Sequence, residues 1–451
     1  MPSENYVLLE RTELNASAAS VTFANIPQTG YTDLKIVVCA RSSSTSGYAE
    51  TVNMKFNNSA TSDYSWRGLY SVTATPGSNN SSSVAQIRAG NVPSANLTAN
   101  TFSNNEIYIP NYTSANFKSV SIDAVSEVNG STDFTYTLML QAALRSNTAA
   151  ITSIDLSLDT GGTSFVAGST FSLYGIAAVG TTPLIAPKAS GGNIIDYDGT
   201  YWIHTFTSSG TFTPQTGLTC DYLVVAGGGG GGGHNAGGGG AGGLRSTVTA
   251  TGGGGSLESA ITVATNTAYA ITVGAGGAGG NDARGSSGAN SVFSTITSTG
   301  GGGGAGNSGG QGATTGGSGG GGHPGAGANG TTNQGRAGGS GFGDPSYAGG
   351  GGGGASAVGV NATSGGGGNG GAGVAVSITG TSVTYAGGGG GSTFNGTQGS
   401  GGTGGGGTAT FNTAPTAATA NLGGGGGAIN RTTAAGGNGG SGVVIIRYPA
   451  A

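Results

Sequence analysis

Charged side chains, proline and long apolar runs are all scarce in this sequence. Asp, Glu, Lys and Arg together make up 7% of the residues, and the formal net charge is −4. Because there is no basic excess to attract phosphate groups, we expect no nucleic-acid partner and no electrostatic binding to anionic lipid. No apolar run is long enough to span a bilayer, so we also expect no membrane insertion. Only 12 prolines are present and the glycines have no strict three-residue period, which excludes collagen.

Cysteine and histidine are rare as well, which limits the chemistry that the chain can carry out. Cys39 and Cys220 are too few for a disulfide framework or a structural zinc site, and we expect both to be core residues. No G-x-S-x-G motif lies between an expected strand and an expected helix, and no phosphate-binding G-x-x-x-x-G-K-[ST] motif is present. We therefore expect no enzymatic activity, no cofactor and no bound metal.

Glycine is in large excess, and its distribution predicts two domains. Residues 1–200 hold 14 of the 101 glycines, whereas residues 226–442 hold 85. The acidic residues are distributed the other way, with 14 in residues 1–200 and 4 after them. We predict a first domain over residues 1–180, a linker rich in Pro, Gly and Ser over 181–200, and a glycine-rich domain over 201–451.

The first domain has the pattern of an all-β fold. Short β-branched and apolar runs alternate with turn residues, and helical periodicity is weak. We expect about nine strands, near residues 6–10, 20–24, 34–39, 52–56, 106–109, 120–124, 134–140, 151–156 and 170–174. Because each strand offers one apolar face, the expected fold is a two-sheet β-sandwich of the jelly-roll type.

Ten runs of four or more consecutive glycines characterise the second domain. Such a composition is typical of a flexible linker, because glycine loses the most conformational entropy on ordering. The alternative is a bundle of polyglycine II helices with three residues per turn, whose backbones hydrogen-bond to one another. Strand-like segments favour the ordered alternative, because disordered chains seldom contain them. They lie at 222–225, 260–263, 269–273, 374–378 and 443–448, and we expect the first and the last to pair in a small sheet.

Several segments follow one another in order between residues 200 and 448. They are Phe206–Thr213, Tyr222–Ala226 with the seven glycines after it, Gly242–Arg245, Tyr269–Gly277 and Gly442–Tyr448. In this combination the chain resembles the glycine-rich domain of bacteriophage tail proteins. Related modules form the tail-fibre tip adhesins of T-even-like phages, in which polyglycine helices pack together. The resemblance implies that the glycine helices are a rigid scaffold and that the loops between them contact the host surface.

A binding site on such a scaffold is expected in the inserts that interrupt the glycine runs. Aromatic side chains beside Asn, Asp or Arg suit a sugar face or a protein loop, since they combine a flat apolar surface with directional hydrogen bonds. The candidates for receptor contact are His234, Asn235, His323, Phe342, Asp344, Tyr347, Phe394, Asn395, Phe411, Asn430 and Arg431. The alternative for each of them is a structural role, either filling a gap in the scaffold or forming a turn.

Two functions of different classes fit these features. The first is that of a phage virion adhesin, a tail-fibre or tail-tip protein. Its first domain attaches to other virion proteins, and its glycine-rich domain binds a host cell-surface glycan or outer-membrane protein. The second is that of a capsid decoration or tail accessory protein whose glycine-rich domain is a structural projection. Inserts of the recognition type favour the adhesin, because a spacer needs only uniform repeats.

Both functions place the chain on the virion, at the tail or the capsid surface, after synthesis in the host cytoplasm. The N-terminal residues contain no basic segment followed by an apolar one, so we expect no signal peptide. Both functions also allow either of two stoichiometries. Phage fibres are often trimers, so a homotrimer fits, but a packed glycine bundle can satisfy its own hydrogen bonds within a single chain.

Overall fold

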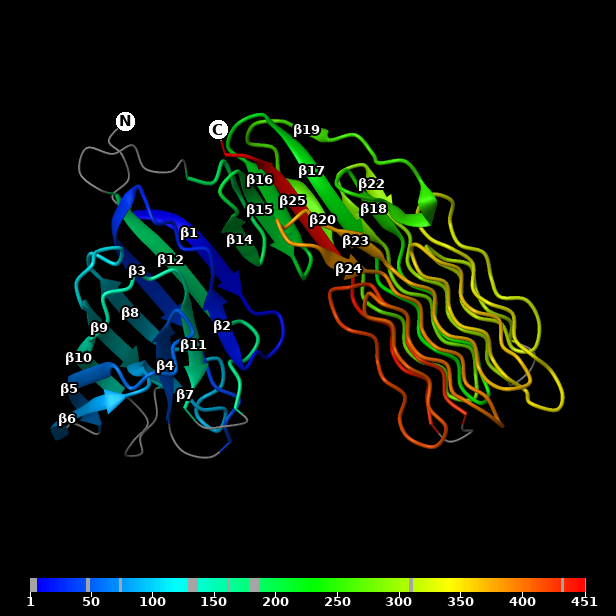
Figure 1. Ribbon diagram of the computed structural model, residues 1–451, viewed down its shortest axis with the longest axis horizontal. Helices are drawn as coiled ribbons and strands as arrows, with labels where there is room; N and C mark the ends of the chain where they lie inside the picture. Colours follow the sequence, from blue (N-terminus) through cyan, green and yellow to red (C-terminus); the bar gives the residue numbers. More distant parts are fainter. Residues whose placement is uncertain are drawn as a thin grey trace. The chain divides into compact units, whose positions relative to one another are not determined.

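The computed structural model is all-β (Figure 1). It describes residues 6–45, 49–72, 75–128, 137–159, 163–177, 186–307, 311–430 and 434–450. The chain divides into two compact units. The first comprises residues 1–187, 193–202 and 450–451, and the second comprises residues 188–192 and 203–449. Within the described residues, no helix has both the length and the apolar character needed to cross a membrane.

The strands of the first unit are β1 (Tyr6–Glu13), β2 (Ser20–Phe23), β3 (Tyr31–Cys39), β4 (Ala49–Phe56), β5 (Tyr64–Val72), β6 (Thr75–Val84), β7 (Ile87–Pro93), β8 (Asn104–Ile109), β9 (Lys118–Ser126), β10 (Thr137–Arg145), β11 (Ile154–Leu158), β12 (Thr170–Ala177) and β14 (Ile194–Tyr197). Strand β15 (Tyr201–Phe206) falls on the boundary between the units in the sequence.

The second unit contains β13 (Ala189–Ser190), β16 (Gly210–Pro214), β17 (Leu218–Val225), β18 (Leu244–Ser246), β19 (Ile261–Val263), β20 (Tyr269–Thr272), β21 (Ser291–Phe293), β22 (Ile296–Ser298), β23 (Val374–Val376), β24 (Val383–Tyr385) and β25 (Val443–Pro449). A single 3-10 turn, η1, spans Gly252–Gly254. Residues 181–200, where we expect a linker, include β13 and β14, and residues 181–185 lie outside the described part of the chain.

The first unit is a two-layer β-sandwich with jelly-roll connectivity. One layer contains the neighbouring strands β1, β12, β3 and β8, and the other is the sheet β2-β11-β4-β7. Followed along the chain, these eight strands alternate between the layers except at β4 and β7, which is how a jelly roll is wound. The structure therefore confirms the predicted β-sandwich.

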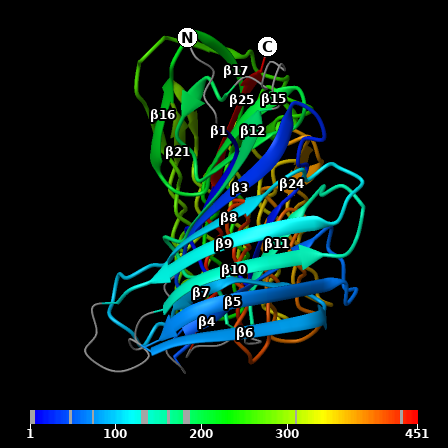
Figure 2. The same cartoon turned by 90° about the vertical axis from the view of Figure 1, so that its left-hand side faces the viewer.

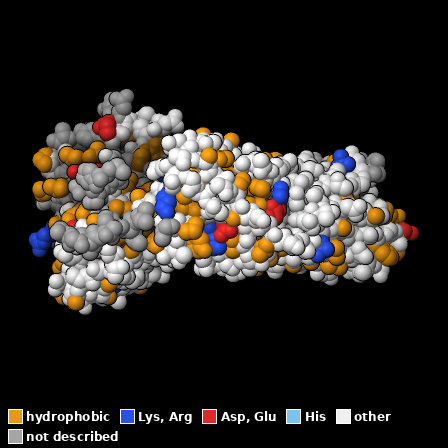
Figure 3. All heavy atoms as spheres, turned by 90° about the horizontal axis from the view of Figure 1, so that it is seen from above, with side chains coloured by type: hydrophobic (Ala, Val, Ile, Leu, Met, Phe, Trp, Pro, Cys, Tyr) orange, Lys and Arg blue, Asp and Glu red, His pale blue; other side chains and the backbone are white. Residues whose placement is uncertain are grey.

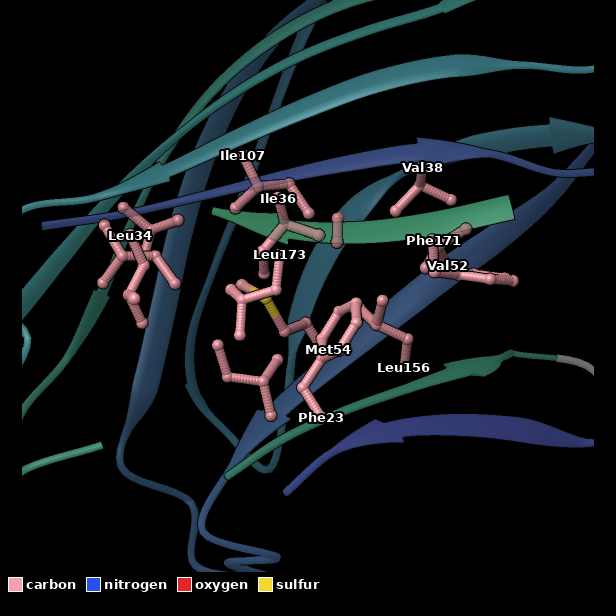
Figure 4. Packing of buried hydrophobic residues seen from close by; sticks show 14 of the residues in the cluster. Phe23, Leu34, Ile36, Val38, Val52, Met54, Ile107, Leu156, Phe171 and Leu173 are labelled. Atoms are coloured by element: carbon pink, nitrogen blue, oxygen red, sulfur yellow. The ribbon is translucent and has the colours of Figure 1, made fainter. Parts of the chain in front are cut away.

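Side-chain alternation explains why the two layers pack together. Every second residue of β9 is buried, for example, as expected for a strand with one face on a core. The inner faces meet in one apolar cluster, to which Ile36 and Leu173 come from one layer and Met54 and Leu156 from the other (Figure 4). The alternation also corrects one expectation. Cys220 is buried as predicted, but Cys39 is exposed because it lies on the outward face of β3.

Strands beyond the eight of the jelly roll widen the first layer. The order continues from β8 through β9, β10 and β5 to β6, and these strands lie side by side in Figure 2. The sequence pattern does not predict β5, β6 or β7, because polar residues interrupt their apolar alternation. The strand expected at 134–140 begins at Thr137, and residues 134–136 lie outside the described residues.

Strands from near the two ends of the second unit's sequence pair with each other in a small sheet. Strand β17 pairs antiparallel with β25, from Asp221 opposite Arg447 to Val225 opposite Val443. This is the predicted pairing of the segments 222–225 and 443–448, and it is confirmed. The predicted strands near 260–263, 269–273 and 374–378 are also present, as β19, β20 and β23.

The glycine segments between these strands hydrogen-bond to one another with a period of three residues. In the run 227–233, every third N–H donates to the same neighbouring segment: Gly227 to Ala289, Gly230 to Ser286 and Gly233 to Ala283. The N–H groups of the residues that follow Gly227 and Gly230 donate in the same way to a second neighbouring segment, Gly228 to Gly440 and Gly231 to Gly437. The polyglycine II helix that the sequence predicts for these segments has the same period, three residues per turn.

Backbone bonding joins the run 227–233 to six other segments. Its N–H groups donate to segments 283–289, 437–440 and 237–240, and its carbonyls accept from 301–304, 277–280 and 426–429. Side chains contribute little cohesion here; one small apolar cluster consists of Ala236, Ala409 and Ala428. Many cooperative backbone hydrogen bonds, each worth about 1 kcal/mol net, thus take the place of an apolar core.

Candidate functional site

The turns between glycine segments gather at one end of the second unit. The chain leaves β17, follows a glycine segment, reverses, and returns to β18, and later segments repeat this course (Figure 1). We call the far end the turn surface. It comprises residues 234–235, 281–283, 323–325, 342–347, 363–366, 393–397, 410–415 and 429–430.

Hydrogen bonds connect these turns into one network. Thr393 is its centre, because its hydroxyl lies within hydrogen-bond distance of the Asn395 carbonyl at 2.9 Å and the Ser346 carbonyl at 3.2 Å, and its carbonyl accepts from Asn430 Nδ2 at 2.8 Å. Ser346 Oγ in turn donates to the Ser364 carbonyl at 2.7 Å. Four backbone hydrogen bonds complete the network. In each, the N–H of the first residue donates to the carbonyl of the second: Phe394 to Ser346, Asn430 to Thr410, Ile429 to Gly232 and Gly341 to Gly325. Turns that are far apart in the sequence are therefore held in fixed positions.

Three of the predicted contact residues present large apolar side chains to solvent on this surface. The exposed fractions are 44% for Tyr347, 54% for Phe394 and 46% for Phe411. Tyr347 and Phe394 lie in adjacent turns, since the Phe394 N–H donates to the carbonyl of Ser346. Asp344 and Asn395 are exposed as well, whereas Phe342 is half-buried.

Three other predicted contact residues are buried, so they are not part of the solvent-facing surface. Asn235, His323 and Asn430 are 5%, 6% and 8% exposed. Asn430 holds two turns together through Thr393. Burial lowers the pKa of His323 to about 4, with the His234 charge acting in the same direction and the Tyr347 backbone opposing it. His323 is therefore neutral at neutral pH.

His234 is half-buried and paired. Its Nδ1 lies 3.0 Å from Asp282 Oδ1 and 3.2 Å from Asn307 Nδ2. His234 and Asn235 both have positive φ angles, 67° and 53°, which mark the sharp reversal of the chain at this turn. Arg431 lies outside the described residues.

Sequence reasoning missed the residues that hold the turn surface together. Ser346, Thr393 and Asp282 are small or lone polar residues, and Ser346 has nothing in its local pattern that distinguishes it from an ordinary turn residue. One signal does exist for Thr393, because it directly precedes an aromatic residue at the end of a glycine run. Asp282 has a similar signal as one of only four acidic residues after residue 200.

The side chains of the turn surface can bind a partner through flat aromatic rings and through hydrogen bonds. Among the described residues, no group of three or more His, Cys, Asp or Glu side chains is placed to hold a metal ion. Charged side chains are sparse on the side of the molecule seen in Figure 3. The turn surface has three exposed aromatic rings, and Asn, Thr and Ser residues lie in the same turns.

Comparison with known proteins agrees with the glycine-rich composition of the second unit. No curated protein sequence matches the chain. The profile of the family described as "Glycine-rich domain" matches residues 206–449, which is 244 of the 451 residues. The match begins within β15 and ends with β25, so it covers the glycine segments together with the sheet that closes them. The chain therefore belongs to the glycine-rich domain family.

Proposed function

We propose that this chain is a phage virion protein, a tail-fibre or tail-tip adhesin, and that its turn surface binds a receptor on the host cell. The observation that carries the proposal is the placement of Tyr347, Phe394 and Phe411, three large apolar side chains about half exposed on a hydrogen-bonded set of turns. The resemblance of residues 200–448 to phage tail proteins supplies the biological setting.

Rigidity makes this surface suitable for recognition. Binding energy is lost when flexible loops must be ordered on contact, and a preorganised surface avoids that cost. Here each turn is anchored by the glycine segment on either side and by side-chain bonds such as that of Ser346 to Ser364. Exposed aromatic rings on rigid elements are the residues that most often dominate binding energy at interfaces.

The first unit has a separate role in this proposal. It is a self-contained jelly roll, a fold that can carry an interface to other virion proteins without disturbing the turn surface. The partners are therefore other virion proteins on one side and a host glycan or outer-membrane protein on the other.

Binding of the purified full chain to host cells tests the proposal. We expect saturable binding that competes with adsorption of the phage, and a loss of affinity of about tenfold or more for Phe394→Ala. Leu257→Ala is the matched control, because Leu257 is 48% exposed in the same unit but lies outside the turn surface. The adhesin proposal would be overturned if the folded wild-type chain does not bind, or if the Phe394→Ala variant binds as well as the wild type. It would favour a capsid decoration or tail accessory protein.

A further inference from the structure

The solvent-facing side of strand β10 in the first unit has no polar side chain. Its outward side chains are all aliphatic, namely Leu138, Leu140, Ala142 and Leu144. The three leucines are 55%, 60% and 36% exposed. An antiparallel strand with one face in water normally alternates apolar inward and polar outward residues. The outward side of β10 thus has the composition of a buried surface.

Neighbouring strands enlarge the apolar surface. Leu69 on β5 lies directly opposite Leu140, and Val125 on β9 lies directly opposite Leu138. They are 62% and 38% exposed. We call this surface the β10 face; it consists of Leu69, Val125, Leu138, Leu140, Ala142 and Leu144. Contiguous exposed apolar surface of this kind marks an interaction site.

A hollow interrupts the β10 face at its smallest side chain. Ala142 lies between Ser121 on β9 and Arg67 on β5, and with Leu140 and Leu69 these residues line an open hollow of about 500 Å³. Because the alanine side chain ends at Cβ, the space above it is free for an apolar side chain from outside. Interfaces gain most of their energy where such side chains fill hollows on the partner.

Opposite charges flank the β10 face on its two sides. Asp123 on β9 is in register with Leu140, and Arg67 on β5 is in register with Ala142. The two residues lie two strand spacings apart, about 10 Å. Neither forms an ion pair within the part of the chain that the structure describes. The face therefore has one unpaired negative edge and one unpaired positive edge.

We propose that the β10 face is the contact between two copies of this chain, packed face to face about a twofold axis parallel to β10. This axis exchanges the two edges, so that Asp123 of each copy comes above β5 of the other, within reach of Arg67. The residual offset along the strand is two residues, about 7 Å, which the long arginine side chain spans. A twofold axis perpendicular to β10 within the interface would instead place like charges over one another.

Charge complementarity and symmetry together select a second copy as the occupant. The two sheets pack in the aligned manner of a β-sandwich, about 10 Å apart, and Leu140 of one copy faces Leu140 of the other at the edge of the hollow that this residue lines. Such an isologous contact is closed, so it buries the β10 face in a dimer and leaves no surface for further growth. The contact involves no residue of the turn surface and is independent of the proposed receptor.

Sedimentation equilibrium of the full chain tests the dimer. We expect a mass twice the 42.7 kDa of one chain. Leu140→Asp should raise the dissociation constant at least about 100-fold, because it places a charge in the centre of an apolar contact. Leu257→Asp is the control, an exposed leucine outside the β10 face, and should remain dimeric. A wild-type mass of one chain, or of three, would overturn the proposal, as would a dimer that survives Leu140→Asp.

Charge reversal tests the orientation without touching the apolar surface. Arg67→Asp and Asp123→Arg should each weaken the dimer roughly tenfold, because each places like charges opposite one another. The double variant should restore wild-type affinity, since it exchanges the two edges. If the double variant is weaker than either single one, the axis is not parallel to β10 and the proposal fails.

Discussion

His204 and Tyr448, 244 residues apart in the chain, meet in the interior of the second unit, where His204 Nε2 lies 3.0 Å from the Tyr448 hydroxyl. His204 Nδ1 lies 2.6 Å from the carbonyl of Gly191, which only accepts, so Nδ1 carries the proton and donates. Nε2 therefore accepts from the tyrosine. The pair joins β15 to β25, the strands with which the glycine-rich domain begins and ends.

Removing the Tyr448 hydroxyl should weaken the connection between β15 and β25. Tyr448→Phe leaves His204 Nε2 buried without a partner, and we expect a loss of about 1–3 kcal/mol from the stability of the second unit. Amide hydrogen exchange of β25 measures it locally. Tyr347→Phe is the control, because its side chain is on the turn surface and about half exposed. Equal protection of β25 in wild type and Tyr448→Phe would contradict the assigned hydrogen bond.

Acid should destabilise the second unit through its buried histidines. Burial lowers the pKa of His204 from 6.5 to about 4, with the Gly191 carbonyl opposing the shift. Between these pH values the unfolded chain binds a proton that the folded chain does not. Stability therefore falls as pH drops through this window, by about 3 kcal/mol in total.

Hydrogen exchange of β25 at pH 7 and at pH 4, corrected for the intrinsic exchange rate, measures this loss. His323 contributes in the same direction, because its pKa is also lowered to about 4. The variant His323→Gln removes that second contribution and isolates the share of His204. Unchanged stability of the variant across the window would show that His204 is not buried as a neutral ring.

A rise in pH from about 4.5 to about 9 should destabilise the first unit through Glu10. This side chain is 9% exposed on β1, and continuation of the β1–β14 register places it opposite Asp196. Burial, and to a lesser extent the Asp196 charge, raises its pKa from 4.5 to about 9. In this window the folded chain binds the extra proton, so stability falls as pH rises, by roughly 1.4 kcal/mol per pH unit.

Glu10→Gln should abolish this loss of stability and stabilise the first unit at pH 8. Tryptophan fluorescence during urea unfolding reports on that unit, because Trp66 and Trp202 are the only tryptophans and both belong to it. Trp202 lines the same small cavity as Glu10. A variant with the same pH profile as the wild type would show that Glu10 is ionised in the folded chain.

A single methyl group in the glycine bundle should be strongly destabilising. A Cβ at Gly425 would lie 2.0 Å from the carbonyl oxygen of Gly239, which is main chain and cannot rotate away. We expect Gly425→Ala to cost the second unit at least about 3 kcal/mol. Gly312→Ala is the matched control, since nothing lies within 4 Å of its added Cβ. Comparable melting of the two variants would contradict the close packing of the backbones.

The sequence determines the parts of the fold that rest on side-chain pattern. Strands such as β9 and β17 alternate or concentrate apolar residues, so each can be recognised locally, and the jelly-roll class follows from their number and spacing. Strand β6 could not be recognised, because Thr75–Val84 is rich in Ser and Asn and becomes a strand only through its pairing with β5.

The sequence also locates the inserts of the candidate site, but tertiary structure decided how they are grouped. Glycine segments carry no side chains, so nothing in their sequence encodes which segment bonds to which. The arrangement of the segments arises from backbone hydrogen bonds that form only when every segment is in place. That arrangement brought Phe394 beside Ser346 and Tyr347, and it buried His323 and Asn430. Which aromatic residues face solvent together is a property of the assembled bundle, because only neighbours in space determine exposure.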